Sequence, residues 1–203
     1  MADDQYMETI ILLRHGETNK NSCGNIHGMG DEERLNKAGI EQIKKAAEEM
    51  RKLVPHKIYS SKEVRAVQSA ELISETLDIP WEIADGVEER NWGSLSGKSV
   101  SEVQLLLNSL SLEDRYLFTP PEGESWQKFE KRLIEAVHAL MEKNIEKTIV
   151  VVTHGGAIRV LMPHLLGMPK EESFKHDPDN ASSTIFRREQ GIFYPVGVNS
   201  LAS

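Results

Sequence analysis

Cysteine, aromatic residues and long apolar runs are all scarce in this sequence. Cys23 is the only cysteine among 203 residues, so no disulfide can form within the chain. The longest apolar stretches, such as the one in TIVVVTHGG, are far shorter than the roughly 20 residues of a membrane-spanning helix. The first residues, MADDQYMET, are acidic where a signal peptide would be basic. We therefore expect a cytoplasmic protein without a membrane partner, in which Cys23 stays a free thiol.

Basic residues are also in the minority. The chain has 24 Lys and Arg against 32 Asp and Glu, which gives a net charge of −8. Binding to a nucleic-acid backbone usually needs a concentrated basic surface, so this composition argues against a nucleic-acid partner. An anionic ligand would have to be held by a local cluster of cations. With 39% hydrophobic residues the chain can bury a sizeable core, and its length favours a single domain over residues 1–203.

Patterns typical of strands and helices alternate along the chain. Residues 9–14, 57–61 and 148–153 are short apolar runs, and 40–54 and 125–143 carry apolar residues at helical spacing. Ser60 followed by Glu63 resembles a capping box, which predicts that a further helix starts there and runs to Leu77. Unbroken Val and Ile runs indicate strands covered on both faces. We predict a three-layer α/β/α sandwich whose mostly parallel sheet has an antiparallel edge, formed by two strands in 182–198 around a Gln-Gly turn.

The alternation breaks between residues 94 and 124, which we interpret as an insertion. Ser99 and Glu102 form a capping-box signal for a short leucine-rich helix. Ligands of open α/β sheets bind beyond the carboxyl ends of the strands, so an insertion at that end would act as a lid. Ordinary packing of an apolar helix is the alternative interpretation.

Two of the predicted strands end in histidine, in ILLRHG and VVTHGG. Because the carboxyl ends of parallel strands meet at one edge of a sheet, His15 and His154 are expected to face each other across a cleft. Gly16, Gly155 and Gly156 permit a sharp turn from strand to helix, and the first amides of such a helix can be directed at an anion. The pattern indicates a site for an anionic ligand.

Several further motifs occur in a fixed order over nearly the whole chain. After RHGETNKN come GNIHG and LNKAG, YSSKEVRAVQSAE, EERNWGSLSG, PEGES, VVTHGG and NASST. In this order they resemble the histidine phosphatase superfamily, also called the phosphoglycerate mutase-like proteins.

The resemblance implies a role for each matching residue. His15 would attack phosphorus to form a phosphohistidine, while Arg14, Arg65 and His154 hold the phosphoryl group. A neutral imidazole is a good nucleophile near pH 7, and guanidinium groups neutralise phosphate oxygens in bidentate fashion. Glu89 would be the general acid and then the general base, and Glu88 is the neighbour that could be confused with it. The expected catalytic residues are thus His15, Glu89, His154, Arg14 and Arg65, and the expected phosphate-binding residues are Arg14, Asn21, His27, Arg65, His154 and Gly155.

The composition of the insertion favours hydrolysis over mutase chemistry. Between Gly97 and Pro121 its only cations are Lys98 and Arg115, among many leucines, whereas the resemblance implies a basic insertion for a mutase. We therefore expect a phosphomonoester hydrolase that needs no metal or other cofactor, acts on a small phosphorylated metabolite, and is a monomer or a homodimer.

Three alternative functions remain open at this point. One is a cofactor-dependent phosphoglycerate mutase. Another is a metallohydrolase, in which His15, His154 and a carboxylate would bind a divalent ion, although the adjacent arginines would repel that ion. The third is a noncatalytic module that binds a phosphorylated ligand.

Overall fold

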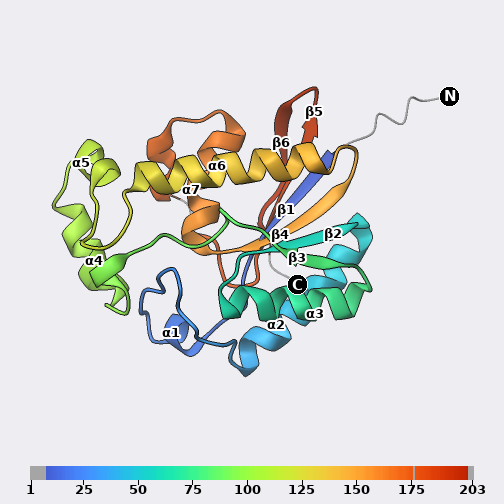
Figure 1. The fold of residues 1–203 in the computed structure, drawn as a ribbon, viewed down its shortest axis with the longest axis horizontal. Helices are drawn as coiled ribbons and strands as arrows, with labels where there is room; N and C mark the ends of the chain where they lie inside the picture. Colours follow the sequence, from blue (N-terminus) through green and yellow to red (C-terminus); the bar gives the residue numbers. More distant parts are fainter. Residues whose placement is uncertain (1–7, 176, 201–203) are drawn as a thin grey trace.

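A six-stranded sheet forms the centre of the protein, which we describe from a computed structural model of residues 8–175 and 177–200 (Figure 1). The order across the sheet is β3-β2-β4-β1-β5-β6. The first four strands in this order are parallel to one another. Strand β5 pairs antiparallel with β1, and β6 pairs antiparallel with β5. The strands are β1 (Glu8–Arg14), β2 (Lys57–Ser60), β3 (Trp81–Ile83), β4 (Thr148–Thr153), β5 (Ser183–Glu189) and β6 (Ile192–Ser200). The predicted parallel sheet with an antiparallel edge is confirmed.

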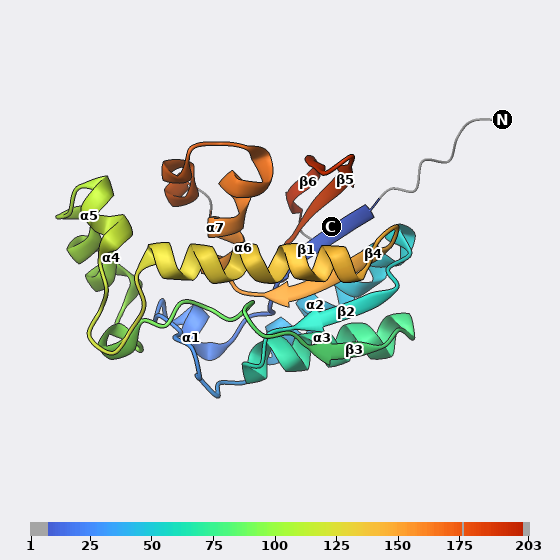
Figure 2. The same cartoon turned by 45° about the horizontal axis from the view of Figure 1, so that its top comes forward.

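Helices cover both faces of this sheet (Figures 1 and 2). On one face, α2 (Lys37–Met50) and α3 (Val64–Leu77) pack against Ile11 and Leu13 of β1. On the other face, α6 (Trp126–Lys143) and α7 (Gly155–Leu166) pack against the alternate residues Ile10 and Leu12. Both sides of β1 are therefore buried, which explains why its sequence is continuously apolar. The three-layer α/β/α prediction is confirmed.

The C-terminal hairpin follows the predicted pattern. Gln190 and Gly191 connect β5 to β6 with φ values of 50° and 83°. Two residues with positive φ are typical of the tight turns whose twist matches that of the flanking strands.

Two predicted details of the helices are wrong. The first helix ends at Met50, followed by a 3₁₀ turn over Arg51–Leu53, and Val54 is exposed with φ 49°. Val54 precedes Pro55, whose ring disfavours the α conformation in the residue before it. The capping box at Ser60 is also absent.

Helix α3 begins instead at Val64, and Glu63 is its N-cap residue without a side-chain capping bond. The hydroxyl of Ser60 donates to the carbonyl of Ser61, and the Glu63 carboxylate turns toward His154. The carboxylate of Glu63 is engaged by His154 and by the hydroxyl of Ser61, so it does not cap the helix.

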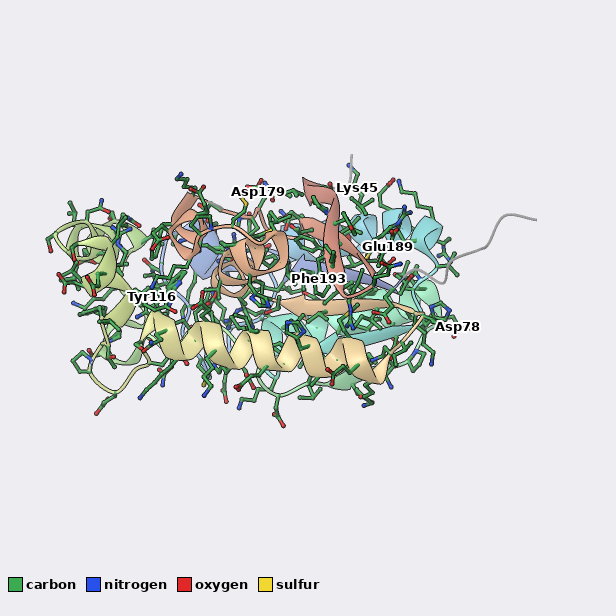
Figure 3. The ribbon with its side chains drawn as sticks, turned by 90° about the horizontal axis from the view of Figure 1, so that it is seen from above. Lys45, Asp78, Tyr116, Asp179, Glu189 and Phe193 are labelled. Carbon is green, nitrogen blue, oxygen red and sulfur yellow. The ribbon has the colours of Figure 1, made fainter. Side chains whose placement is uncertain are left out.

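The insertion between β3 and α6 consists of α4 (Val100–Asn108) and α5 (Leu112–Leu117), together with the 3₁₀ turn Gly93–Leu95. The Ser99–Glu102 capping box is confirmed, with both reciprocal hydrogen bonds present. Figure 1 shows α4 and α5 at one end of the molecule, next to the start of α6. There Tyr116 of α5, which Figure 3 labels near the start of α6, donates a hydrogen bond to Glu130 of α6. The insertion is thus attached to the layer of α6 and α7.

Two smaller helical elements complete the described chain, namely α1 (Asn19–Ser22) after β1 and the 3₁₀ segment Lys170–Lys175 after α7. Over residues 8–175 and 177–200, no helix combines the length and the apolar character needed to cross a bilayer.

Candidate active site

The site lies where β1, β4 and β2 end side by side. Arg14 of β1 pairs with Thr153 of β4, so the next residues, His15 and His154, leave the sheet together. The amide of His15 donates to the carbonyl of Thr153 at 3.0 Å, which extends the ladder by one bond. The two imidazole rings have a centroid distance of 5.2 Å. The structure therefore brings both predicted histidines together.

Arg65, near the start of α3, joins the two rings. Its Nε donates to Nε2 of His15 at 3.2 Å, and its Nη2 donates to Nδ1 of His154 at 3.1 Å. Its Nη1 donates to the carbonyl of Asp31 at 3.3 Å, and the residue is fully buried. A guanidinium has no acceptor atom, so each imidazole nitrogen that faces Arg65 carries a lone pair.

His15 is held as a neutral imidazole. Its Nδ1 donates to the carbonyl of Gly16 at 2.7 Å, which leaves the lone pair on Nε2. Burial lowers the pKa of His15 well below 6.5, and the positive charges of Arg65 and Arg14 lower it further. The ring is thus uncharged at neutral pH, with Nε2 as the atom that can attack an electrophile.

Arg14 provides a second buried guanidinium beside the rings. Its Nη1 donates to the carbonyl of Pro178 at 2.6 Å, and its buried Nε has no hydrogen-bond partner among the described residues. A Cβ atom on Gly155 would lie 3.3 Å from that Nε, so the start of α7 is in contact with the guanidinium. Arg14, His15 and Gly155 all line one pocket.

Glu89 enters the same pocket from the loop after β3. Its Oε1 accepts from the amide of Arg90 at 2.7 Å, and its Oε2 accepts from the amide of Gly156 at 3.0 Å. A Cβ atom on Gly156 would lie only 2.3 Å from the carboxylate, so this approach requires glycine. The carboxylate is consequently fixed at the start of α7, beside His154.

Glu88 points away from the pocket. Its carboxylate lies 3.5 Å from Nζ of Lys62 and 3.4 Å from Nη1 of Arg132. Of the two adjacent acidic residues, Glu89 alone lines the pocket.

Arg132 of α6 holds the loop that carries Glu89. Its Nη1 donates to the carbonyls of Gly86 and Glu88, and its Nη2 donates to the carbonyl of Glu89 at 2.8 Å. The same guanidinium forms an ion pair with Glu124 at 2.7 Å. One side chain thereby holds three carbonyl groups of residues 86–89, next to the Glu89 carboxylate.

Asn21 and His27 lie in the wall of the pocket. The amide oxygen of Asn21 accepts from Asn180 at 3.1 Å and from Thr18 at 3.2 Å. Both ring nitrogens of His27 are engaged, Nε2 with Thr18 at 2.8 Å and Nδ1 with Asp31 at 3.1 Å. The pKa of His27 is lowered to about 4, mainly by burial and further by the charge of Arg65. The charge of Asp31 opposes this shift. Phosphate contact by these two residues stays a prediction.

A possible set of metal ligands occurs next to this wall. Among the described residues, His27, Asp31 and Glu33 place three ligand atoms within 4.8 Å of one another. The ammonium of Lys20 lies 2.5 Å from Asp31 and 3.8 Å from Glu33, so a cation of the protein already pairs with both carboxylates.

The pocket has a volume of about 310 Å³ and two chemically different halves. His15, Arg14 and Glu89 form one half. Apolar side chains from the insertion, from α6 and from the 3₁₀ segment Lys170–Lys175 line the other, together with Arg90 and two further arginines. This outer half includes Trp92, Val103, Leu107, Arg115, Trp126, Arg159 and Phe174.

Sequence reasoning did not identify Ser61 and Glu63, which contact His154 directly. Glu63 follows Ser60 by three residues, a spacing that resembles a capping box. Only the position of His154 in space distinguishes the two roles, and no local pattern contains it.

A family model described as histidine phosphatase superfamily (branch 1) matches residues 10–200. The chain belongs to the histidine phosphatase superfamily. Over 195 residues it is 28% identical to the 2,3-bisphosphoglycerate-dependent phosphoglycerate mutase of Thermoplasma acidophilum, covering 96% of this chain and 94% of the mutase. Over 159 residues it is 32% identical to a metal-independent phosphoserine phosphatase of Arabidopsis thaliana, covering 75% of this chain and 66% of that phosphatase.

A solved histidine phosphatase fold superposes closely on this one. A mutant phosphoserine phosphatase from Entamoeba histolytica, in complex with phosphoserine, has a TM-score of 0.81 at 28% identity and covers 95% of this chain and 97% of its own. As a histidine phosphatase superfamily member, the protein is an enzyme with both phosphatases and mutases among its relatives.

Proposed function

We propose that this protein is a metal-independent phosphomonoesterase that works through a phosphohistidine at His15. The observation that carries the proposal is the position of Arg65, whose guanidinium donates to Nε2 of His15 and to Nδ1 of His154. A phosphoryl group between the rings would take over these N–H donors and expose the nucleophilic lone pair. The same guanidinium would repel a divalent cation from both imidazole nitrogens, which supports a mechanism without metal.

The reaction has two displacements. Nε2 of His15 attacks phosphorus in line, the N–P bond forms, and the P–O bond to the leaving group breaks. Glu89 gives its proton to the departing oxygen and then takes one from the water that attacks phosphohistidine. The second step breaks the N–P bond and restores neutral His15. Arg14, Arg65 and His154 stabilise the phosphoryl oxygens, and each such donor typically contributes about 3 to 4 kcal/mol in the transition state.

The outer half of the pocket suits a small organic phosphate with a partly apolar body. Val103 and Leu107 of α4 and Trp126 of α6 supply apolar contact area, while Arg115 and Arg159 add positive charge at its border. In this proposal the insertion acts as a lid that excludes water from the leaving group.

Substitution of His15 by Ala tests the mechanism. We expect His15→Ala to lower the hydrolysis of p-nitrophenyl phosphate by about 1,000-fold or more, because the nucleophile is gone. His56→Ala changes an exposed histidine at the opposite end of the sheet and serves as the control. Radiolabelled substrate should leave acid-labile label on the wild type and none on His15→Ala. Unchanged turnover in that variant would contradict the proposal.

A phosphoglycerate mutase is the second candidate, favoured by the similarity to the Thermoplasma mutase over nearly the whole chain. Isomerisation of phosphoglycerate primed by a bisphosphate, at a rate well above hydrolysis, would establish it. A parallel assay with EDTA tests the metallohydrolase alternative, which predicts loss of activity and its recovery with zinc.

A further inference from the structure

His154 has a buried carboxylate on the side away from His15. Oε2 of Glu63 lies 3.2 Å from Nε2 of His154, and both side chains are fully buried. The hydroxyl of Ser61 lies 2.7 Å from the same Nε2 and donates to Oε2 of Glu63 at 2.6 Å. Ser61, Glu63 and His154 thus form a closed set of three hydrogen-bonding groups.

These contacts determine which nitrogen of His154 carries the proton. An ionised carboxylate only accepts, and the Ser61 hydrogen is already given to Glu63, so Nε2 must be the donor. Nδ1 then holds the lone pair, in agreement with the hydrogen bond that it accepts from Arg65 at 3.1 Å. In this state His154 faces the reacting groups with an acceptor.

An acceptor is the wrong group to face a phosphoryl dianion. The ring must gain a proton on Nδ1 before it can donate to a phosphoryl oxygen. Four charged or titratable side chains surround it: Arg65 disfavours the imidazolium, Glu63 and Glu89 favour it, and His15 lies 5.2 Å away as a neutral ring. Since Glu89 must exchange a proton during the reaction, Glu63 is the constant negative charge of the group.

We propose that Glu63 is a positioning residue that holds the Nε2–H of His154 and stabilises this ring as an imidazolium while a phosphoryl group is bound. Nδ1 takes one proton from water as the dianion enters, donates it in a hydrogen bond to a phosphoryl oxygen, and returns it to water when phosphate leaves. The inference rests on the proposed function, because it requires a phosphoryl group beside His154.

Glu63 is suited to this role because it stays ionised. Burial alone would raise the pKa of its carboxyl group, but the hydrogen bonds from His154 and Ser61 and the charge of Arg65 outweigh it and lower the pKa to about 2. Its Oε1 has no hydrogen-bond partner among the described residues, so the charge is directed at His154 and Ser61. Carboxylates that orient histidines act in this way in other enzymes, where they fix the tautomer and stabilise the imidazolium.

The test uses Glu63→Gln and inorganic phosphate as the probe. Glutamine keeps the size and can still accept from Nε2–H, but it has no charge. In ¹⁵N-histidine NMR spectra at pH 7, saturating phosphate should convert one ring of the wild type to an imidazolium, assigned by its absence in His154→Gln. In Glu63→Gln that ring should stay neutral, and phosphate should bind about tenfold more weakly or worse.

Glu71→Gln is the matched control, since it removes one exposed negative charge from the same helix. It should titrate like the wild type. The variant Glu63→Asp keeps the charge and should retain the imidazolium signal together with part of the activity, which a purely structural role would not predict. The high-pH limb of kcat/KM should move to lower pH in Glu63→Gln alone.

The inference fails if His154 stays neutral in the phosphate-saturated wild type, or if Glu63→Gln and the wild type give the same ring signals and the same pH profile. The wild-type spectrum decides this even where a variant does not fold. The ring signals and the phosphate affinity do not depend on turnover, so they remain informative if the proposed hydrolysis itself is wrong. That failure would show instead as full activity in His15→Ala.

Discussion

Gly156 is the residue at which packing and chemistry are most tightly linked. Its missing side chain lets the Glu89 carboxylate approach the first turn of α7 and accept the Gly156 amide at 3.0 Å. Any larger residue would displace the carboxylate from this place, where the proposed mechanism has it protonate the leaving group.

We predict that Gly156→Ala slows hydrolysis most for substrates with basic leaving groups. A poor leaving group needs the general acid, whereas p-nitrophenolate departs with little help. The expected result is a drop of about 10- to 100-fold for an alkyl phosphate and a much smaller one for p-nitrophenyl phosphate. An equal loss for both substrates would show that Gly156 matters for phosphate binding rather than for Glu89.

Individual residues were predictable from sequence where a motif stands next to a strand end. His15 and His154 were expected to meet because each follows an apolar strand and precedes glycine. Glu63 was not predicted, because its role depends on a residue 91 positions away. The Ser60–Glu63 spacing suggested a local cap, but the Glu63 carboxylate contacts His154, which lies in another part of the chain.

Besides lining the pocket with Trp126, helix α6 holds the Glu89 loop through one side chain. Arg132 donates to the carbonyls of Gly86, Glu88 and Glu89, and it faces the buried carboxylate of Glu88. The loop has no regular secondary structure of its own at Glu89, so the helix determines where this carboxylate, the general acid of the proposed mechanism, lies.

Substitution of Arg132 by Met should therefore affect both stability and turnover. We expect the free energy of unfolding to fall by about 2 to 3 kcal/mol, because buried carboxylate and carbonyl oxygens lose their donor. We also expect kcat to fall at least tenfold as Glu89 loses its fixed position. Lys131→Met, at the exposed neighbouring position, is the control for urea unfolding and kinetics. Equal behaviour of the two variants would contradict this assignment.

Helix α4 offers a matched pair of leucines for testing the outer pocket. Leu107 lines the pocket and is 8% exposed, whereas Leu105 on the same helix is 73% exposed. We predict that Leu107→Gln raises the KM for aryl phosphates several-fold and that Leu105→Gln leaves it unchanged, because only the first side chain contacts the leaving group. A similar KM for both variants would place the leaving group elsewhere.

Secondary structure was more predictable than its arrangement. The apolar periods of β1, α2, α6 and β4 were clear from the sequence, and so was the Gln190–Gly191 turn. Helix ends were less clear, since Val54 continues the apolar period but stands before proline. Strand order was beyond reach, because periodicity shows that a strand is buried without showing which strands lie beside it.

At the scale of the whole molecule, the site contributes a dependence of stability on pH. The pKa values of His15, His154 and His27 are all lowered from 6.5, chiefly by burial, and that of His27 to about 4. Below pH 6.5 the unfolded chain binds protons that the folded rings do not accept. Acidification therefore favours unfolding, and this part of the stability is complete only above pH 6.5.

We predict that the free energy of unfolding falls by about 3 kcal/mol or more between pH 7 and pH 4, the part due to His27 alone being about 3 kcal/mol. Urea unfolding at several pH values measures this. His27→Gln should reduce the slope between pH 6.5 and pH 4, because its side chain does not titrate. A stability that is constant from pH 7 to pH 5 would show that the rings are not held neutral.

The order of strands in the sheet has a consequence for how the protein is made. Strand β4 lies between β1 and β2, although it is synthesised long after both. A growing chain can form α2 and α3 and pair β2 with β3 early, but no strand connects β1 to β2 until residue 153 has left the ribosome. Contacts between such distant segments form slowly. Enzymatic activity should therefore be among the last properties to return when the denatured chain refolds.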